Sequence, residues 1–253
     1  MGKIIAVVNQ KGGVGKTTTA VNLTAALTAR GKKVLLCDFD PQANATSGLG
    51  VDKNEAPVSV YDVIINGEAA ADAVIHTPYG DVIPSASALS GAGIELVGVP
   101  NREFVLQQAL QPLREQYDYI FIDNPPSLEM LTLNGLCAAD SILIPVQCEY
   151  YALEGLSDLM TTLRGVKRSL NPDLHIFGVV LTMYDGRTNF SAQVAEEVRR
   201  HFRGQVFATA IPRNVRLSEA PSHGLPIFAY DKFSRGAAAY NALADEICGK
   251  EHD

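Results

Sequence analysis

The chain has 253 residues, of which 47% are hydrophobic and 19% charged, and its formal net charge is −7. This size can bury one large core, and no linker rich in proline, glycine or serine divides it, so we expect a single domain over residues 1–253. No stretch approaches the roughly 20 apolar residues that span a membrane, and the N-terminus carries no charged segment followed by an apolar cleavage region. We therefore expect a cytoplasmic protein.

The charge is unevenly distributed along the chain. Residues 1–159 contain 9 Lys/Arg and 18 Asp/Glu, a formal charge of −9, whereas residues 160–253 contain 12 and 10, a charge of +2. The acidic total argues against a globally basic nucleic-acid binder, but the last third is a candidate surface for a polyanion. The four cysteines are widely spaced and form no C-x-x-C pair, which favours reduced thiols over a zinc or iron–sulfur site.

The hydrophobic pattern predicts alternating strands and helices. Apolar runs rich in β-branched residues predict buried strands at 4–8, 34–37, 119–122, 141–146, 176–182 and 206–211. Helical patterns lie between them, at 17–29, 101–116, 127–138, 153–170, 190–203 and 235–248. Residues 50–100 are less periodic, and we expect short helices there and one edge strand near residues 82–84. The order predicts an α/β fold in which helices cover both faces of a mostly parallel sheet.

A glycine-rich turn joins the first strand to the first helix. Residues 11–18 read Lys-Gly-Gly-Val-Gly-Lys-Thr-Thr. Glycines let the backbone bend and point successive N–H groups inward, and the following helix offers its positive dipole end to an anion. Lys16 would reach the β and γ phosphates of ATP, and the Thr17 hydroxyl would bind the bridging Mg²⁺. The residues expected to hold the nucleotide are Lys11, Gly12, Gly13, Val14, Gly15, Lys16, Thr17 and Thr18.

This loop is a variant of the usual phosphate-binding pattern. The pattern G-x-x-x-x-G-K-[ST] requires glycine at position 10, where this chain has Gln10. It also carries an additional lysine, Lys11. A side chain that points away from its own phosphates there would serve a neighbouring subunit.

Other polar residues follow the predicted strands. Asp38 and Asp40 follow the second strand, Asp123 follows the run at 119–122, and residues 183–188 follow the run at 176–182. Ligands of open α/β sheets sit beyond the carboxyl ends of the strands, so these segments should converge on one crevice. An ordinary turn or helix-cap role remains an alternative for Asp38 and Asp40.

Residues 11–18 resemble the deviant phosphate loop of the ParA/MinD class of ATPases. A narrower similarity, to the chromosomal ParA or Soj proteins, extends nearly from end to end and is carried by residues 38–48, 123–128, 145–155 and 211–222. The resemblance implies a P-loop type of fold and hydrolysis of ATP to ADP and phosphate.

The resemblance also assigns roles in the crevice. It implies that Asp40 positions the attacking water, that Asp38 helps to hold the metal shell, and that Asp123 contacts Mg²⁺ through water. Lys11 would cross the interface of an ATP-dependent homodimer, and Gly12 must be small because the partner's backbone approaches there. The residues expected to act in catalysis are Lys11, Lys16 and Asp40, and those expected to hold the metal are Thr17, Asp38 and Asp123.

The base of the nucleotide is assigned to a loop late in the chain. Pro212, Arg213 and Asn214 match the adenine-side loop of the family, and Met183 is expected near the base, with core packing as its alternative. Asn124 departs from the family, in which Cys, Thr or Ala is usual. We expect Ser127 to cap the following helix.

Two arginines match positions that the Soj group uses to hold DNA without sequence preference. They are Arg187 and Arg216, both in the basic last third. Arg199, Arg200 and Arg203 form a further cluster, for which a solvated helix face is the alternative. Binding of this kind is dominated by phosphates and weakens with salt.

The resemblance thus implies a nucleotide switch. ATP drives dimerisation, the dimer binds non-specific double-stranded DNA of the nucleoid, and hydrolysis, stimulated by a ParB-type protein, releases it in chromosome segregation. One alternative is a MinD-like membrane-associated regulator of division, which ends in a basic amphipathic helix, whereas residues 242–253 are acidic. Another is a metabolic P-loop enzyme with a small acceptor, for which no motif is present.

Overall fold

The structure is a computed structural model, and it describes residues 2–149 and 152–249. Two segments discussed above are therefore incomplete in the structure. The segment 145–155 lacks Tyr150 and Tyr151, and the segment 242–253 lacks residues 250–253, which lie outside the described residues. Seven strands form one sheet in the order β3-β4-β2-β5-β1-β6-β7, and all neighbours are parallel except β3 and β4. The strands are β1 (Lys3–Val7), β2 (Val34–Asp38), β3 (Ile75–Thr77), β4 (Gly80–Ile83), β5 (Tyr119–Asp123), β6 (Ser141–Gln147) and β7 (His175–Thr182).

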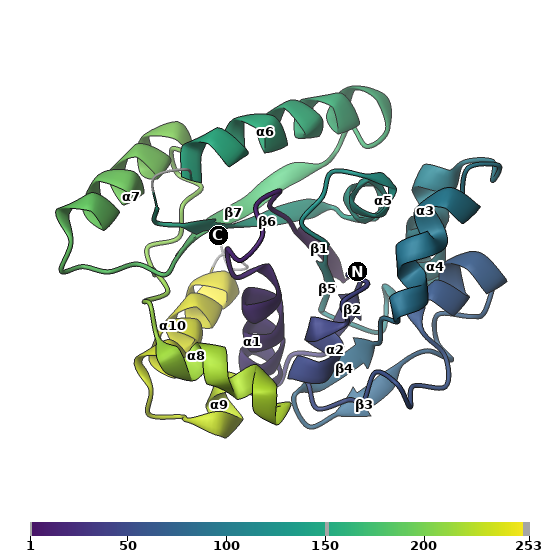
Figure 1. Cartoon of the computed structure of the whole chain (residues 1–253), viewed down its shortest axis with the longest axis horizontal. Coiled ribbons are helices and arrows are strands. Elements are labelled where there is room, and N and C mark those ends of the chain that lie inside the picture. The colour runs from purple at the N-terminus through teal and green to yellow at the C-terminus, as the bar shows by residue number, and fades with distance from the viewer. Residues whose placement is uncertain (1, 150–151, 250–253) are drawn as a thin grey trace.

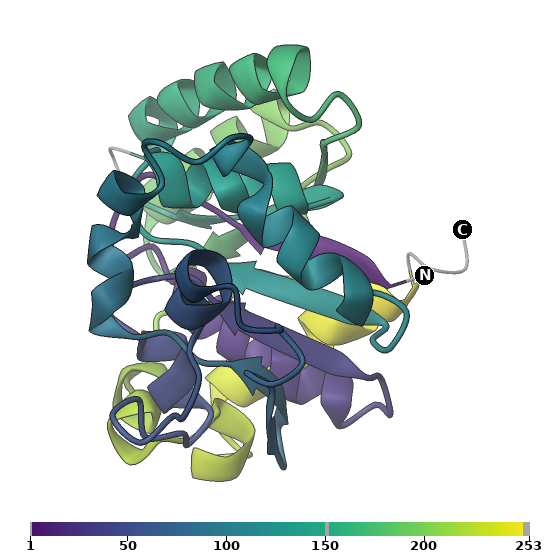
Figure 2. The same cartoon turned by 90° about the vertical axis from the view of Figure 1, so that its right-hand side faces the viewer.

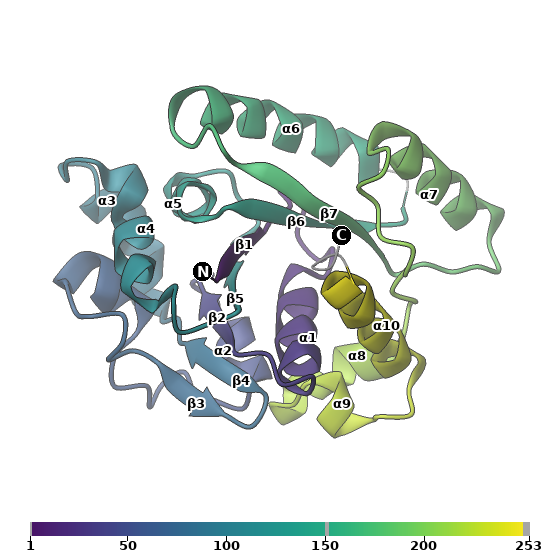
Figure 3. The same cartoon turned by 180° about the vertical axis from the view of Figure 1, so that it is seen from behind.

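Helices cover both faces of this sheet (Figure 1). On one face lie α4 to α7, and on the other α1 and α10 pack side by side, with α8 and α9 next to them (Figures 1 and 3). Figure 2 shows the same layers from the side. The helices are α1 (Lys16–Thr28), α2 (Asn44–Gly48), α3 (Ala92–Glu95), α4 (Val105–Leu110), α5 (Met130–Ala138), α6 (Ala152–Ser169), α7 (Asn189–His201), α8 (Val215–Glu219), α9 (Ile227–Tyr230) and α10 (Arg235–Gly249).

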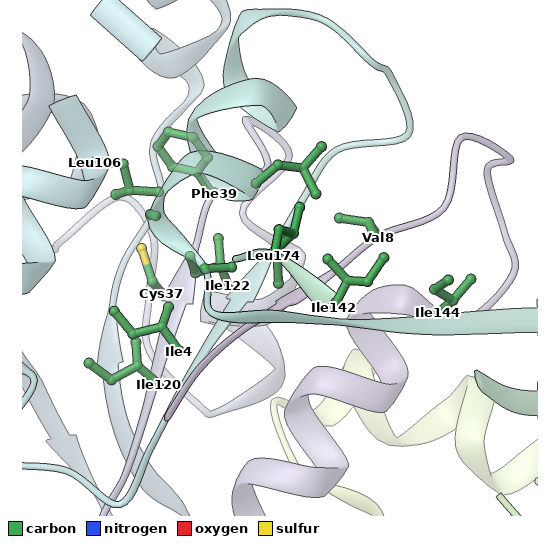
Figure 4. Close-up of a cluster of buried hydrophobic side chains, with 14 of the residues drawn as sticks. Ile4, Val8, Cys37, Phe39, Leu106, Ile120, Ile122, Ile142, Ile144 and Leu174 are labelled. Carbon is green, nitrogen blue, oxygen red and sulfur yellow. The ribbon is translucent and has the colours of Figure 1, made fainter. Parts of the chain in front are cut away.

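Alternation along the central strands builds the two layers of the core. Ile4 and Val8 face the cluster that includes α5 and α6, whereas Ile5 and Val7 face α1 and α10. Figure 4 shows the first cluster, in which side chains of β1, β2, β5 and β6 gather on one face of the sheet. Every residue of β2 and β5 is buried, as expected for strands covered on both faces. The sequence-predicted α/β fold is confirmed.

The predicted strand at residues 206–211 is wrong. This segment bonds to the edge of β7 only at its ends, where Phe207 N–H donates to the Val179 carbonyl at 2.9 Å and Ile211 N–H to the Leu181 carbonyl at 2.8 Å. Between them, the N–H groups of residues 208 and 209 donate to the carboxylate of Glu246 in α10. The side chain of Glu246 therefore replaces the partner strand in the middle of the segment.

The predicted helix at residues 101–116 is interrupted. It consists of a 3₁₀ turn at Arg102–Phe104, α4, and a second 3₁₀ turn at Gln111–Leu113. Pro112 has no N–H and its ring opposes a continuing α-helix, which explains the end of α4 at Leu110. The edge strand expected near residues 82–84 is β4, and the sequence pattern missed its antiparallel neighbour β3.

The expected cap at Ser127 is also wrong. Helix α5 begins at Met130 after Glu129, and no side chain caps it. The Ser127 carbonyl instead accepts a hydrogen bond from the Thr132 hydroxyl at 2.6 Å. The segment after Asp123 is thus tied to the first turn of α5 through its backbone.

Candidate active site

The glycine-rich loop connects the end of β1 to the start of α1, at the carboxyl edge of the sheet. Gly13 and Gly15 have φ angles of +73° and +90°, which residues with a Cβ rarely adopt. Asn9 ties the loop to β6, because its side chain accepts from the Lys11 N–H at 3.0 Å and donates to the Pro145 carbonyl at 2.7 Å. The Thr182 hydroxyl donates to the carbonyl of buried Val14 at 2.8 Å. The loop is therefore held by both β6 and β7.

Gly12 differs from the other two loop glycines. Its φ angle is not positive, and among the described residues the atom nearest to a Cβ built on it would be the Cβ of Pro126, at 4.0 Å. Nothing in the described part of the chain requires glycine there, and the residue is exposed. The neighbouring Lys11 side chain makes no ion pair within the described part of the chain, so its ammonium is available to an outside anion.

Lys16 is the buried cation of the site. Its side chain is 6% exposed, and its Nζ donates to the Lys11 carbonyl at 3.3 Å across the loop. Burial lowers the pKa of Lys16, and the negative charges of Asp123 and Asp40 act in the opposite direction. An ammonium so poorly solvated gains strongly from an anion placed in the loop.

Asp123 is the most deeply buried carboxyl group of the site beside Asp38. It ends β5, it is fully buried, and neither carboxylate oxygen has a hydrogen-bond partner among the described residues. Burial raises its pKa well above the ordinary value, and the charge of Asp38 adds to this, whereas the Thr17 hydroxyl and the Lys16 ammonium oppose it. A buried carboxylate without a partner, beside a hydroxyl, has the oxygen donors that Mg²⁺ prefers, so the residues fit this cation.

Asp38 lies opposite Asp123 in the pairing of β2 with β5 but has a different environment. Its Oδ2 accepts from the Thr46 N–H at 2.7 Å and from the Thr46 hydroxyl at 2.6 Å. Burial raises the pKa of Asp38 to about 6, against the effect of these hydrogen bonds. Because Asp38 is already bonded to α2, it shapes the loop that carries Asp40.

Asp40 stands at the mouth of the site. It is 8% exposed, and its Oδ1 accepts from the Gln42 N–H at 2.9 Å, whereas its second carboxylate oxygen accepts no backbone hydrogen bond from the described residues. Its charge is close enough to act on both Lys16 and Asp123. The three loop-end carboxylates and Lys16 thus lie together, as the sequence predicts.

The adenine-side residues of the prediction also lie next to one another. Met183 has a φ angle of +51°, rare for a residue with a side chain, and this turn ends β7. The following Tyr184 accepts from the Arg213 N–H at 3.2 Å and pairs with Pro212. Asn214 caps α8, because its side chain accepts from the Arg216 N–H at 2.8 Å. The structure therefore joins the Met183 turn to the loop at residues 212–214.

Both predicted DNA-binding arginines are exposed and paired with carboxylates of this chain. The side chain of Arg187 is 89% exposed and donates twice to Asp185, which lowers the pKa of the Asp185 carboxyl to about 2. Arg216 donates to Glu219 at 2.8 Å and lies 3.5 Å from Asp231. Of the helix α7 cluster, Arg200 pairs with Glu196 and Glu197, as on a solvated helix face.

Asn124 is buried between β1 and α5. Its Nδ2 donates to the Val7 carbonyl at 3.3 Å and to the Ile122 carbonyl at 3.1 Å, and its Oδ1 has no partner in the described residues. A Cβ on Gly135 of α5 would overlap this oxygen. The asparagine therefore fits because α5 has glycine at that position.

Three supporting residues were missed by sequence reasoning. They are Asn9, Thr46 and Thr182, each of which bonds a loop that carries a predicted site residue. Thr46 lies in a segment that carries the family resemblance, and Asn9 directly follows the first apolar run. Their places in the sequence were therefore the only feature that could have indicated a role at the site. Thr46 and Thr182 bond residues 8 and 168 positions away, and Asn9 bonds Lys11 two positions away and Pro145 136 positions away.

Comparison with known proteins identifies the family. Residues 2–176 match the family model described as an AAA domain. The chain is 58% identical to the sporulation initiation inhibitor protein Soj of Bacillus subtilis strain 168 over 249 residues, which are 98% of each chain. It is 50% identical to the chromosome-partitioning ATPase Soj of Treponema pallidum strain Nichols, over 99% of each chain. The chain belongs to the ParA/Soj family of chromosome-partitioning ATPases.

A solved structure agrees with this assignment to a nucleotide-binding fold. A crystal structure of cobyrinic acid a,c-diamide synthase from Mycobacterium smegmatis, with bound ATP analogue and magnesium, aligns with a TM-score of 0.88 at 37% identity, covering 100% of this chain and 97% of that one. This ParA/Soj-family chain is thus an ATPase with a P-loop fold. Within the described residues, no helix combines the length and apolar character required to cross a membrane.

Proposed function

We propose that this chain is an ATP-dependent switch that binds and releases DNA during chromosome partitioning, with residues 1–253 acting as one domain. The observation that carries the proposal is the meeting of buried Lys16 with unpartnered Asp123 at the glycine-rich loop. Each of these buried groups is poorly solvated and only partly balanced by the other, and Mg²⁺-ATP would supply an anion for the lysine and a cation for the aspartate.

The bound Mg²⁺ would neutralise charge on the β and γ phosphates. Thr17 and Asp123 would hold it, the latter through water, and Asp38 would keep the Asp40 loop in place through Thr46. Asp40 would orient the attacking water, since phosphoryl transfer depends on positioning and charge more than on covalent chemistry. Lys16 would stabilise the charge that develops on the transferred group. The loop at residues 212–214 and Met183 would enclose the base.

The outer surface of the loop supports the proposal that two copies dimerise through the nucleotide. Lys11 has an ammonium without an ion pair in the described residues, and Gly12 is glycine although this chain leaves room for a Cβ. A second copy that brings its backbone to Gly12 and receives Lys11 at its own ATP explains both features. Hydrolysis would then weaken the interface, because the nucleotide is part of it.

The output of the switch is DNA binding. Arg187 and Arg216 would contact backbone phosphates, and exposed ion pairs of the kind they form are worth only about 0–1 kcal/mol, so phosphates can replace their carboxylates. Two copies in one dimer double these contacts, which couples ATP to affinity. The release step would be stimulated by a ParB-type protein, on the nucleoid in the cytoplasm.

The test is binding of a non-specific DNA duplex with ATP, ADP or no nucleotide, at low and moderate salt. We expect ATP-dependent binding by the natural protein and its loss in Arg187→Ala/Arg216→Ala. The Arg164→Ala variant, which removes an exposed arginine of α6, is the control and should bind like the natural protein. Absence of DNA binding together with persistent hydrolysis would reject the DNA function, and ATP-dependent sedimentation with liposomes would then favour the MinD-like alternative.

A further inference from the structure

A cavity of about 320 Å³ opens beside the adenine-side loop and is lined by three arginines. Arg187 comes from the turn after β7, Arg213 from the loop before α8, and Arg235 from the first residue of α10. The other lining residues are Tyr184, Asp185, Gly186 and Pro212. We call this feature the arginine cavity. Figure 1 shows that α10 and α8 lie together on the face of the sheet away from α6.

The three arginines differ in how their charge is balanced. Arg187 forms a two-bond pair with Asp185, and Arg213 donates to Glu149 at 2.9 Å. Arg235 is exposed and makes no ion pair within the part of the chain that the structure describes. The cavity therefore has a surplus positive charge, and Arg235 is its source.

The start of α10 adds to the positive potential at Arg235. The helix has 15 residues, and its first turn is capped by Ser234, whose hydroxyl accepts from the Ala237 N–H at 3.1 Å. The positive end of the helix dipole thus lies at the same edge of the cavity as the Arg235 side chain. Arginine, with a planar fork of donors, is suited to phosphate oxygens.

We propose that the arginine cavity binds one phosphodiester group of the DNA backbone and that Arg235 is its anchoring cation. This inference rests on the proposed DNA-binding function and adds to it a residue that lies outside the pair suggested by the family resemblance. Arg235 offers its guanidinium without first leaving a carboxylate. Arg187 leaves Asp185 to complete the contact, since an exposed ion pair is opened at little cost.

The cavity also borders Pro212 and Arg213, which are expected on the adenine side of the nucleotide. A nucleotide phosphate is therefore the competing occupant. The surplus charge of the cavity comes from Arg235 on α10, whereas the glycine-rich loop already provides the phosphate cradle at the end of β1. This separation favours DNA as the source of the anion.

The test compares Arg235→Gln with Lys167→Gln, each of which removes one exposed positive charge. Lys167 is in the last turn of α6, on the opposite face of the sheet. The affinity for a non-specific duplex is measured with ATP from about 50 to 200 mM salt, together with the affinity for ATP. For Arg235→Gln we expect a plot of log affinity against log salt that is less steep by about 0.9 for each lost phosphate contact, so by about 1.8 in a dimer. Lys167→Gln should keep the natural slope.

Each other outcome has a definite meaning. If the slope of log affinity against log salt is unchanged in Arg235→Gln, the inference is overturned and the proposed function stands. The same holds if Arg235→Gln and Lys167→Gln reduce the slope equally, because that result indicates a general charge effect. Weaker ATP binding in Arg235→Gln alone assigns the cavity to the nucleotide. A natural protein that does not bind DNA overturns inference and function together. Arg235→Lys, which keeps the charge and the helix start, should retain most of the slope and guards against a folding defect in the Gln variant.

Discussion

Charged groups gather in two regions of the molecule. One is the carboxyl edge of the sheet at the glycine-rich loop, where they are buried, and the other is the exposed surface formed by α8, the start of α10 and the turn between β7 and α7. At the loop, Lys16, Asp38 and Asp123 are buried, and burial moves all three pKa values away from their ordinary range. At the surface, Arg187 and Arg216 are exposed and already paired. Buried charges store a large free energy that a ligand can release, whereas exposed charges give weak contacts that salt and partners can exchange.

This difference suits the two proposed tasks. Chemistry on a triphosphate needs groups whose positions are fixed before the substrate arrives. Reversible attachment to DNA needs contacts that form and break readily, each contributing little.

Replacing the buried cation should abolish most activity. We expect Lys16→Gln to lower the rate of ATP hydrolysis by about 10²–10³-fold, because one preorganised charge at the transferred phosphate is lost. Phosphate release under saturating ATP is the measurement. Lys33→Gln, at an exposed residue just before β2 and at the opposite edge of the parallel sheet from the loop, is the control, and an equal loss in both variants would contradict the assignment.

The buried fit between Asn124 and Gly135 should be visible in stability. Gly135→Ala places a methyl group on Oδ1 of Asn124, so we expect a loss of about 1–3 kcal/mol in the free energy of unfolding. In the Asn124→Ala background, Gly135→Ala should lower the free energy of unfolding much less, because the overlapping Oδ1 is absent. Alanine is also a better helix former than glycine. Denaturant unfolding of the four proteins forms the cycle. Additive effects would show that the two residues do not interact.

Removing the unpartnered carboxylate should stabilise the protein without nucleotide. We expect Asp123→Asn to raise the free energy of unfolding by about 1–3 kcal/mol at neutral pH, because burial opposes ionisation of this carboxyl group and the amide stays neutral. The folded-state pKa of Asp123 is raised, so the natural protein loses stability as pH rises above about 4, the ordinary value. The advantage of the variant should therefore vanish near pH 3 and grow with pH. The pKa of Asp38, about 6, places part of the natural protein's loss between pH 4 and 6.

The same variant should lose the stabilisation that Mg²⁺-ATP gives to the natural protein. Thermal unfolding with and without Mg²⁺-ATP measures this difference. If the variant gains no stability without ligand, or if Mg²⁺-ATP stabilises it as much as the natural protein, Asp123 is not a destabilising carboxyl group that binds the cation. Asp118→Asn, at an exposed aspartate before β5, is the matched control.

The smallest effects are expected at the exposed surface. Arg187→Gln should leave the free energy of unfolding within about 0.5 kcal/mol of the natural value. Its log–log salt plot for DNA binding should be less steep by about 0.9 for each lost contact. Asp185→Asn should instead strengthen DNA binding, because Arg187 loses its competing carboxylate. If Arg187→Gln and Asp185→Asn changed DNA binding in the same direction, Arg187 would not exchange the Asp185 carboxylate for a phosphate.

The same contrast explains what the sequence could predict. The glycine-rich loop, Lys16 and the strand-end aspartates are local patterns, and buried parallel strands are recognisable from their apolar runs. By contrast, the bond of Thr46 to Asp38 and the replacement of a strand partner by Glu246 depend on side chains brought together by folding. Arg235 carries no local sequence signal, because its proposed role depends on the loops at residues 184–187 and 212–213, which line the same cavity.

We propose that the nucleotide state of the buried site controls DNA binding at the exposed surface. The most direct measurement is the dissociation of protein from non-specific DNA after loading with Mg²⁺-ATP, for the natural protein and for Asp40→Ala. We predict that the natural protein leaves the DNA as ATP is hydrolysed, whereas Asp40→Ala binds ATP, hydrolyses it about 10²–10⁴-fold more slowly, and stays bound. Equal dissociation rates for the two proteins, or binding to DNA that is the same with ADP as with ATP, would contradict the account.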